Sequence, residues 1–514
     1  MKSTIETSLA DADMDYTLKL KAESRKNRPP AYHVFTVLGE YFLFDTSTQL
    51  LYCVDELTYD FLMLCLKCSI EEAAKNLHDS NKYAPEAIEQ ARHDIQLLAA
   101  NGLFEVPNYA MSAKKFEASL DRRAKTPVAK ITLGTTESCN LACVYCYCSI
   151  QRDSSKKMLT NKMAKAAVDW LFKYCGDAEE LSITFFGGEP YLNKKVIYYT
   201  VEYSKKLAEK HNKKLKFMAT TNATLIDEEF GKFLAENHFS NLISLDGPPE
   251  IHDRQCPTRG GDGSYQQASE GAKRLLSYQR KSMVRCTLTK PVLRINELVD
   301  FFEQFGFGSC FLGPSSNRDE NLSRYDYDEA DYLDLDKQSE EMIPEILRKK
   351  SQGEPVFYNP YEKGISKFES RLRTLFPSNC GAASNGCVYI NVDGTIYPCH
   401  QFYGFDAWKM GNILDDKPLP EEAQKDYWRK FRKAFKRCES CWAGLLCQGP
   451  CSAQMMLENG TFSKNLRFCE SRRFVLERAG YLYYKQNLLK EDTESPNEKQ
   501  ILQKEKSNEE KSAS

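Results

Sequence analysis

The stretch Val128-Ala-Lys-Ile-Thr-Leu133, followed closely by Cys139-Asn-Leu-Ala-Cys143-Val-Tyr-Cys146, decides the fold. The first run predicts a strand, and the cysteine loop then lies beyond its carboxyl end, where parallel sheets bind ligands. Zinc sites usually take four ligands from paired cysteines or histidines. Three thiolates on one loop instead indicate a 4Fe–4S cluster with one iron open to an amine and a carboxylate. On this motif alone, a zinc or structural iron–sulfur loop remains the alternative.

Strands and helices alternate six times after this point. The alternation predicts a parallel α/β sheet with crossover helices, either open or closed into a partial barrel. In such folds the chemistry lies at the carboxyl ends of the strands. We expect strands at 128–133, 181–186, 217–220, 242–245, 283–289 and 309–312, and helices at 162–174, 194–210, 227–237, 265–277 and 295–305.

Polar residues follow the successive strands of this predicted sheet. Phe185-Phe186-Gly187-Gly188-Glu189-Pro190 closes the second strand, where two glycines let backbone approach a ligand and Glu189 can accept from an ammonium group. Thr220-Thr221-Asn222-Ala223-Thr224 closes the third, and Ser244-Leu245-Asp246-Gly247-Pro248, suited to a ribose, closes the fourth. Arg285, on the fifth, could meet a carboxylate. Because these ends share one edge, they predict a single pocket.

The cysteine loop and the Gly-Gly-Glu-Pro run resemble the signature motifs of radical S-adenosylmethionine (SAM) enzymes over about residues 126–312. The resemblance implies a partial (β/α)6 radical SAM barrel in which Cys139, Cys143 and Cys146 hold a 4Fe–4S cluster whose open iron binds SAM. Ala223 departs from the pattern, because relatives usually carry Gly there. The cofactor-binding residues expected at this pocket are Gly187, Gly188, Glu189, Thr221, Asn222, Ser244, Asp246 and Arg285.

A second group of cysteines has the spacing Cys438-x2-Cys441-x5-Cys447-x3-Cys451, then Cys469, with Cys380 and Gly394-x4-Cys399 upstream. This pattern resembles the SPASM extension of radical enzymes, which holds two auxiliary 4Fe–4S clusters. Cys387 is either the fourth ligand of the inner cluster or a bystander, which would leave an iron open to a substrate thiolate. A zinc ribbon is the alternative, but the full spacing with Tyr397-Pro398-Cys399-His400 argues against it. The resemblance implies Cys438, Cys441, Cys447 and Cys469 at the outer cluster, and Cys380, Cys399 and Cys451 at the inner one.

Residues 31–107 predict a small winged-helix-like α+β unit of three strands and three helices, with Leu103–Val106 returning to the sheet. Its helices are not basic, which argues against DNA binding. The segment His33–Val54 supplies a sheet edge to which an extended peptide can add. The unit resembles the recognition element that binds leader peptides of ribosomally made, post-translationally modified peptides. A purely structural cap is the alternative.

Composition limits the partners and the compartment. A formal net charge of −2 does not suggest a nucleic-acid partner. No export signal is found and no apolar run reaches the ~18 residues of a membrane span, so we expect a cytoplasmic protein. We expect a flexible arm at 1–30, the recognition unit at 31–107, a linker, the radical SAM core at 126–345, the SPASM domain at 372–475 and a disordered tail at 490–514.

The whole arrangement resembles thioether-forming maturases of cysteine-rich peptides. It implies that a 5′-deoxyadenosyl radical removes hydrogen from a bound precursor peptide, and that a cysteine sulfur then joins a carbon. A flavodoxin- or ferredoxin-type donor would supply electrons. Carbon–carbon crosslinking and sulfatase-maturase-type oxidation are the enzymatic alternatives, and an iron–sulfur redox relay or regulator is the non-enzymatic one. No His/Asp dyad indicates a catalytic base.

Overall fold

The computed structural model describes most of the chain. The arm expected at residues 1–30 and the tail expected at 490–514 lie almost wholly outside the described residues. Within the described part, no helix is both long and apolar enough to cross a bilayer. The described ranges are 30–107, 113–146, 157–279, 282–291, 293–315, 323–370, 382, 386–447, 449, 451–453 and 466–493.

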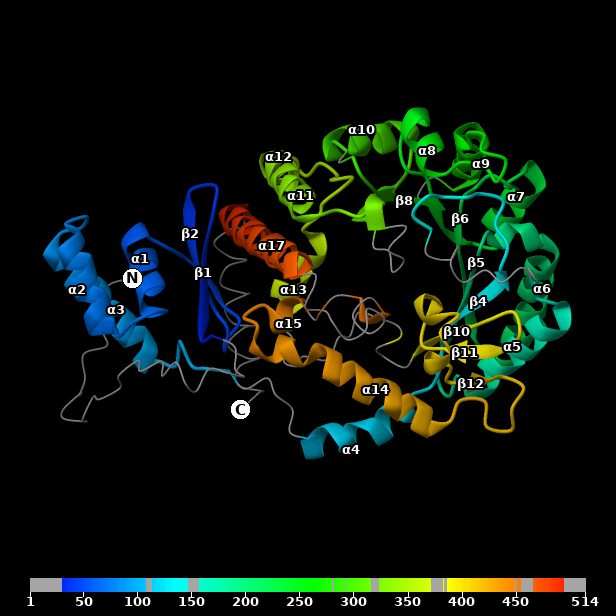
Figure 1. The fold of residues 1–514 in the computed structure, drawn as a ribbon, viewed down its shortest axis with the longest axis horizontal. Helices are drawn as coiled ribbons and strands as arrows, with labels where there is room; N and C mark the ends of the chain where they lie inside the picture. The colour runs from blue at the N-terminus through cyan, green and yellow to red at the C-terminus, as the bar shows by residue number, and fades with distance from the viewer. Residues whose placement is uncertain are drawn as a thin grey trace.

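A parallel sheet forms the centre of the larger body (Figure 1). Its six strands lie side by side in sequence order, and every neighbouring pair is parallel, which confirms the predicted α/β fold. The strands are β4 (Lys130–Thr136), β5 (Glu180–Gly187), β6 (Lys214–Thr221), β7 (Ser240–Ser244), β8 (Met283–Leu288) and β9 (Ser309–Pro314).

Crossover helices cover one face of this sheet. In α5 (Asn161–Tyr174), for example, Ala164, Ala167, Val168 and Leu171 are fully buried at helical spacing. Thr160 caps this helix by accepting from the Met163 amide. The other helices of the series are α6 (Lys194–His211), α7 (Glu228–Glu236), α8 (Pro249–Gln255), α9 (Tyr265–Tyr278) and α10 (Ile295–Phe305).

The opposite face of the sheet is open. Side chains alternate along each strand, so those between the buried positions point away from the helices. On β8, Val284 and Cys286 are fully buried, whereas Arg285 between them is exposed. Met218 on β6 is likewise 42% exposed between buried neighbours. The inner face therefore has room for ligands beside the strand ends.

A hairpin extends the sheet beyond β4. Strand β10 (Cys387–Ile390) runs parallel to β4, and β11 (Thr395–Tyr397) returns antiparallel to it. The short β12 (Gly411–Asn412) pairs with β11 and completes nine strands in the order β12-β11-β10-β4-β5-β6-β7-β8-β9. The segment that follows the radical domain in sequence is thus fixed to its first strand.

The N-terminal unit is a separate three-stranded antiparallel sheet with helices, as predicted. Alternate side chains enter two different cores: Val34 and Leu43 pack on the unit's own helices, while Phe35 and Phe44 pack on the C-terminal part of the chain. Both faces of the sheet are therefore covered. Its elements are β1 (Tyr32–Val37), β2 (Glu40–Asp45), β3 (Leu51–Val54), α1 (Glu56–Cys65), α2 (Ile70–Ser80) and α3 (Pro85–Ala100).

Two expectations for the segment after α3 are wrong. Leu103–Val106 forms no strand; instead the Phe104 amide donates to the buried Asp45 carboxylate. The polar stretch taken as a linker contains α4 (Ala113–Ala124), which packs on α14 (Glu421–Phe435). Phe116 on α4 is buried, but charged residues flank it in the sequence. The helix therefore has too few apolar residues for an amphipathic pattern to be recognised.

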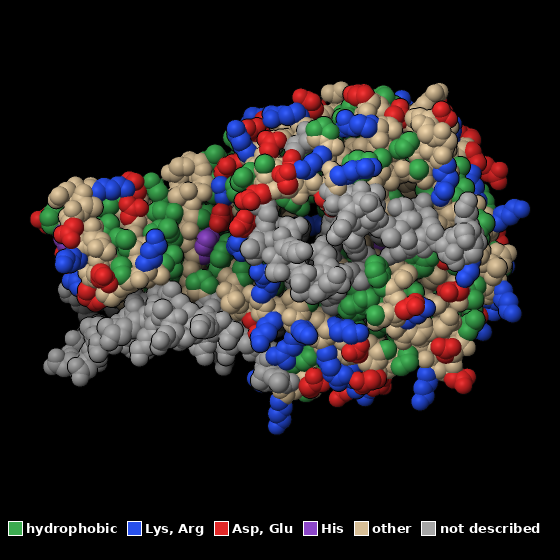
Figure 2. Space-filling model, in the orientation of Figure 1, with side chains coloured by type: hydrophobic (Ala, Val, Ile, Leu, Met, Phe, Trp, Pro, Cys, Tyr) green, Lys and Arg blue, Asp and Glu red, His purple; other side chains and the backbone are tan. Residues whose placement is uncertain are grey.

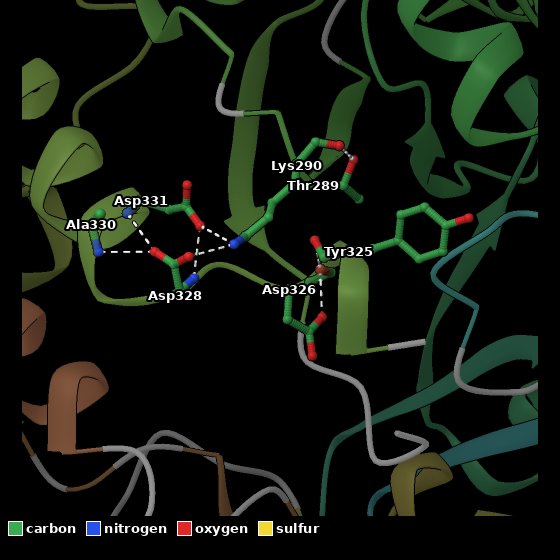
Figure 3. A network of polar contacts seen from close by, with 8 residues as sticks. Thr289, Lys290, Tyr325, Asp326, Asp328, Ala330 and Asp331 are labelled. Carbon is green, nitrogen blue, oxygen red and sulfur yellow. Dashed lines mark hydrogen bonds and ion pairs between the residues drawn. The ribbon is translucent and has the colours of Figure 1, made fainter. Parts of the chain in front are cut away.

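The described region after β9 is mostly helical. Figure 3 shows how it is tied to the sheet: Lys290, just after β8, pairs with Asp328 and Asp331 at the start of α11. Ser315, just after β9, donates to Asp326 at 2.7 Å. The remaining helices are α11 (Glu329–Glu341), α12 (Ile343–Ser351), α13 (Glu362–Ser370), α15 (Gly444–Cys447) and α17 (Leu466–Thr493).

Candidate active site at the carboxyl ends of the strands

The loop that carries the first three cysteines is held along its backbone. Ala142 and Val144 donate to the carbonyls of Pro257 and Gln255 at 2.8 and 2.9 Å. Leu141, 2% exposed, forms an isolated bridge with Thr258. The segment 255–258 thus acts as a short strand against the loop. It fixes the loop beyond the end of β4, where the sequence predicted it.

The three cysteines are half-buried on this loop, and the Cys146 amide donates to the Cys143 carbonyl. A fourth thiol lies next to them, because the fully buried Cys256 hydrogen-bonds with Cys143. Its sulfur is also 3.3 Å from the Tyr145 hydroxyl. Cys256 lies 113 residues after Cys143 in the sequence, so no local cysteine spacing indicates this contact.

Both glycines of the Gly-Gly-Glu-Pro run lie in close contact with the loop that leads to the cysteines. A Cβ on Gly188 would be 2.0 Å from the Ser138 carbonyl oxygen, and one on Gly187 would be 2.2 Å from the Thr136 oxygen. Gly187 also has φ +142°, which favours glycine. The Glu189 amide donates to Ser138 at 2.8 Å. Here the glycines serve close backbone packing.

Glu189 is a buried carboxylate that joins two strand ends. Its Oε1 accepts from the Tyr191 amide and the Thr221 hydroxyl, and its Oε2 accepts from the Asn222 amide at 2.8 Å. Burial outweighs these three donors and raises the pKa of Glu189 to about 7. Oε2 accepts only one of these bonds, so it keeps capacity for a cationic ligand.

Asn222 connects the third strand end to the cysteine loop. Its Nδ2 donates to Asn140 Oδ1 at 3.0 Å and lies 3.9 Å from the Cys139 sulfur. Asn140 in turn donates to the Thr224 hydroxyl. Ala223 adopts φ +61°, so the backbone takes the left-handed form that glycine would adopt more easily.

Asp246 lies in the core rather than at an open surface. Its Oδ2 accepts from the Tyr145 hydroxyl at 2.7 Å, and its Oδ1 accepts from the Thr287 amide. Burial raises the pKa of this carboxyl. Its oxygens lie within 4.8 Å of ligand atoms of His252 and Cys256, a possible metal-binding group. However, His252 Nδ1 accepts from the Asp246 amide and Nε2 contacts Ser264, so both ring nitrogens are occupied.

Ser244 and Arg285 lie opposite one another in the β7–β8 register. Both are on the open face of the sheet, and Arg285 lies 5.8 Å from the ring of Phe311. The structure therefore brings the expected cofactor residues to one edge and one face, with Asp246 just beneath them. Sequence reasoning missed Asn140 and Tyr145, although both lie within the quoted cysteine loop.

Four of the later cysteines come together. Burial, followed by the nearby thiols of Cys447, Cys441 and Cys469, raises the pKa of the Cys438 thiol. Burial and Cys447 likewise raise that of Cys469. These are the four residues expected at the outer cluster. Their approach from α17 and the 438–447 segment fits a metal centre, because several thiolates brought close together are the ligands that iron–sulfur clusters use.

The inner set is described only in part. Cys387 begins β10, and Cys399 follows the end of its antiparallel partner β11, so both lie at the same end of the hairpin. Cys451 is exposed, and Cys380 lies outside the described residues. The His400 ring, next to Cys399, contacts the Phe186 ring at 4.3 Å between centroids. All these ligand assignments stay predictions.

Comparison with known proteins agrees with this geometry. Residues 133–304 match the model of the radical SAM superfamily, and residues 380–442 match that of the SPASM iron-sulfur cluster-binding domain. A cysteine-type anaerobic sulfatase-maturating enzyme of Clostridium perfringens is 29% identical over 69% of this chain and 96% of its own length. A serine-type enzyme of Bacteroides thetaiotaomicron is 23% identical over 61% and 80%.

A solved structure described as native anSMEcpe with bound AdoMet superposes with a TM-score of 0.59. It is 25% identical and covers 70% of this chain and all of that one. The family models imply a 4Fe–4S cluster, auxiliary clusters and SAM. The residues fit these groups: three thiols converge on one loop, four on another centre, and the Gly187–Gly188 backbone closes against the first loop. The chain is therefore a radical SAM enzyme with a SPASM domain.

Proposed function

We propose that this enzyme modifies a ribosomally made, cysteine-rich precursor peptide by linking a cysteine sulfur to a carbon of another residue. The observation that carries the proposal is the docking of the N-terminal sheet onto the segment with the outer-cluster cysteines. The His33 ring stacks on Trp442 at 3.8 Å between centroids, and Trp442 follows Cys441 in sequence. A unit suited to peptide capture is thus attached directly to the redox part of the enzyme.

The attachment is extensive. His33 Nε2 lies 2.9 Å from Glu477 on α17, and Lys485 on α17 pairs with Glu40 at 2.7 Å. Phe44 meets Trp442 edge to face. One face of the N-terminal sheet therefore packs against α17 and Trp442, and their aromatic side chains share one core. A peptide held by the unit would keep a fixed position relative to the cysteines.

β3 is one of the two edge strands of this sheet, and β1 is the other. The Asp45 amide donates to the Leu50 carbonyl. Hydrogen-bonded and non-hydrogen-bonded pairs alternate along an antiparallel ladder, so the N–H and C=O groups of Leu51 and Cys53 point away from β2. No further strand of the described chain pairs with that edge. An extended leader peptide can add there through main-chain hydrogen bonds.

The residues at the strand ends would position SAM and the peptide. When bound, the cluster and SAM supply the radical that removes a hydrogen atom from the peptide. Glu189 and the Gly187–Gly188 backbone would hold the methionine end, Arg285 would meet a carboxylate, and Ser244 would lie near the ribose. The open inner face beside Met218 would receive the peptide. A flavodoxin- or ferredoxin-type protein would supply electrons.

Sulfatase-type oxidation is the second candidate, because the relatives quoted above are described as sulfatase-maturating enzymes. It accounts for the radical and SPASM domains. About a third of this chain lies outside that match, which leaves the docked N-terminal unit without a role under this candidate.

Mass spectrometry of a co-expressed cysteine-rich peptide separates the candidates. After reduction, which opens any disulfide of the same mass, a thioether product still lacks two hydrogens, keeps its sulfur and resists alkylation of the linked cysteine. A carbon–carbon crosslink loses two hydrogens but leaves its thiols alkylatable, and conversion of cysteine to formylglycine replaces sulfur by oxygen and also removes two hydrogens. An unchanged or sulfur-depleted peptide would remove the thioether proposal.

A proline at the β3 edge tests leader binding. Cys53→Pro removes an outward N–H while sparing the bonds to β2, so we expect leader affinity to fall at least about tenfold. Cys53→Ser keeps the N–H and is the matched control. Fluorescence anisotropy with a labelled leader measures both. Equal affinity of the proline variant and wild type would exclude this edge.

The pKa of Glu189 predicts pH-dependent SAM binding. An ammonium group favours the ionised carboxylate, and with a pKa of about 7 this form is lost as pH falls. We expect SAM affinity to drop by up to about tenfold per pH unit below that value. Titration of the reconstituted enzyme with SAM at several pH values measures this. Glu189→Gln should bind more weakly at high pH and show a flat profile; a sloping profile in that variant would assign the effect elsewhere.

A further inference from the structure

A strongly basic run leads directly into the outer-cluster cysteines. Between Asp426 and Glu439 the chain carries six cations and no acid. This run covers the carboxyl half of α14 and ends next to Cys438, whereas Glu421 and Glu422 occupy the other end of the helix. The six are Arg429, Lys430, Arg432, Lys433, Lys436 and Arg437.

A second helix extends the positive surface. α4 runs antiparallel to α14, because Glu117 pairs with Arg429 and Asp121 with Lys425. The amino end of α4, with exposed Lys114 and Lys115, therefore lies beside the carboxyl end of α14. Figure 2 shows Lys and Arg side chains gathered over this part of the molecule. We call the surface formed by Lys114, Lys115, Arg432, Lys433, Lys436 and Arg437 the basic patch.

Part of the positive charge has an internal use. Arg473 hydrogen-bonds with the Cys441 sulfur. Arg437 interacts electrostatically with Cys438 and Cys469, and Lys367 does so with Cys447. These cations offset the negative charge of the converging thiolates. They explain the charges next to the sulfurs but not those further out.

For Lys433 and Lys436 no electrostatic interaction with the cysteines is found among the described residues. Lys433 and Lys436 are exposed and make no ion pair within the described part of the chain. The helix dipole favours cations in the last turn of α14, yet it gives no reason for the lysines at the amino end of α4, where the dipole disfavours them.

We propose that the basic patch docks an acidic one-electron carrier protein, which passes one electron to the outer auxiliary cluster. No bond forms or breaks: the carrier is oxidised by one electron and the cluster is reduced by one. Opposite charges raise the encounter rate and orient the carrier's redox centre toward Cys438. The proposal rests on the four outer cysteines being ligands, but not on the identity of the peptide product.

A charge-reversal variant tests this docking. In Lys433→Glu/Lys436→Glu, with a reduced acidic flavodoxin at about 20 mM salt and no SAM, we expect the second-order rate of cluster reduction, followed by stopped-flow absorbance, to fall at least about tenfold. If the electron then passes on to the SAM-binding cluster, the apparent KM for the carrier in 5′-deoxyadenosine formation should rise by a similar factor. The value of kcat at saturating carrier, and the rate with dithionite, should not change. The assay contains no precursor peptide, so failure of the peptide proposal would not affect it.

The matched control is Lys206→Glu/Lys210→Glu on α6, which makes the same charge change at exposed lysines with no ion pair among the described residues. It should leave the rate of cluster reduction by the carrier unchanged. The defect of the patch variant should also disappear at about 300 mM salt. An equal fall in the reduction rate of the control, an equal loss with dithionite, or an unchanged reduction rate would overturn the proposal. In a separate binding measurement, weaker binding of an acidic precursor peptide by Lys433→Glu/Lys436→Glu, without any defect toward the carrier, would also overturn it.

Discussion

Cys143→Ala is expected to abolish cleavage of SAM, with a loss of at least about a thousandfold in 5′-deoxyadenosine formation. The cofactor carries the chemistry, and two thiolates cannot hold a cluster that must keep one iron open. The other two centres should survive, so bound iron should fall by about a third after anaerobic reconstitution. Liquid chromatography of the nucleoside and iron analysis of the same sample measure both effects.

Cys286→Ala is the matched control for this variant. Its thiol is more deeply buried than that of Cys143 and donates to the Asp246 carbonyl, but no contact with the three-cysteine loop is found for it in the described structure. It should keep its iron and most of its SAM cleavage. If Cys143→Ala kept full nucleoside formation, or both variants lost it equally, the assignment of Cys143 as a ligand would fail.

Gly188→Ala is expected to damage both the fold and the cofactor site. The new Cβ would lie 2.0 Å from the Ser138 oxygen and 2.9 Å from the Cys139 nitrogen, both backbone atoms that cannot rotate away. The loop must shift, at a cost of about 1–3 kcal/mol in the free energy of unfolding. Because the loop carries Cys139, we expect SAM affinity to fall more than about tenfold as well.

Gly231→Ala separates this effect from a general intolerance of alanine. Gly231 lies in α7, and its added Cβ would meet Tyr278 at an ordinary 3.5 Å. Helix propensity favours alanine there, so stability should stay equal or rise. Thermal unfolding and SAM binding of the two variants provide the comparison. Wild-type SAM affinity in Gly188→Ala would show that the loop does not depend on this contact.

The sequence predicted what depends on local pattern. Each of the six parallel strands is bounded by turn residues and alternates with an amphipathic helix. The hydrophobic repeats of strand and helix can therefore each be recognised within a short stretch of sequence. The cysteine loop was likewise visible, because its three thiols lie within eight residues of each other. The positions of Gly187, Glu189 and Asn222 followed from the rule that parallel strands end at one edge.

Prediction failed where burial depends on a distant partner. The segment around Phe116 was assigned to a linker because its composition is polar, yet α14 covers its few apolar residues. Leu103–Val106 was assigned to the sheet because it is apolar, yet Asp45 holds the Phe104 amide in a turn. In both cases the side chains that decide the outcome lie far away in sequence.

By itself, the sequence determined a parallel α/β core, a three-cysteine loop at its ligand-binding edge and a second group of cysteines. Only the tertiary structure decided that Cys256 lies against Cys143, that Glu189 is buried enough to raise its pKa to about 7, and that the N-terminal sheet docks on Trp442. The physical reason is that strand and helix periods are local, whereas burial and hydrogen-bond partners are set by contacts between residues far apart in the chain.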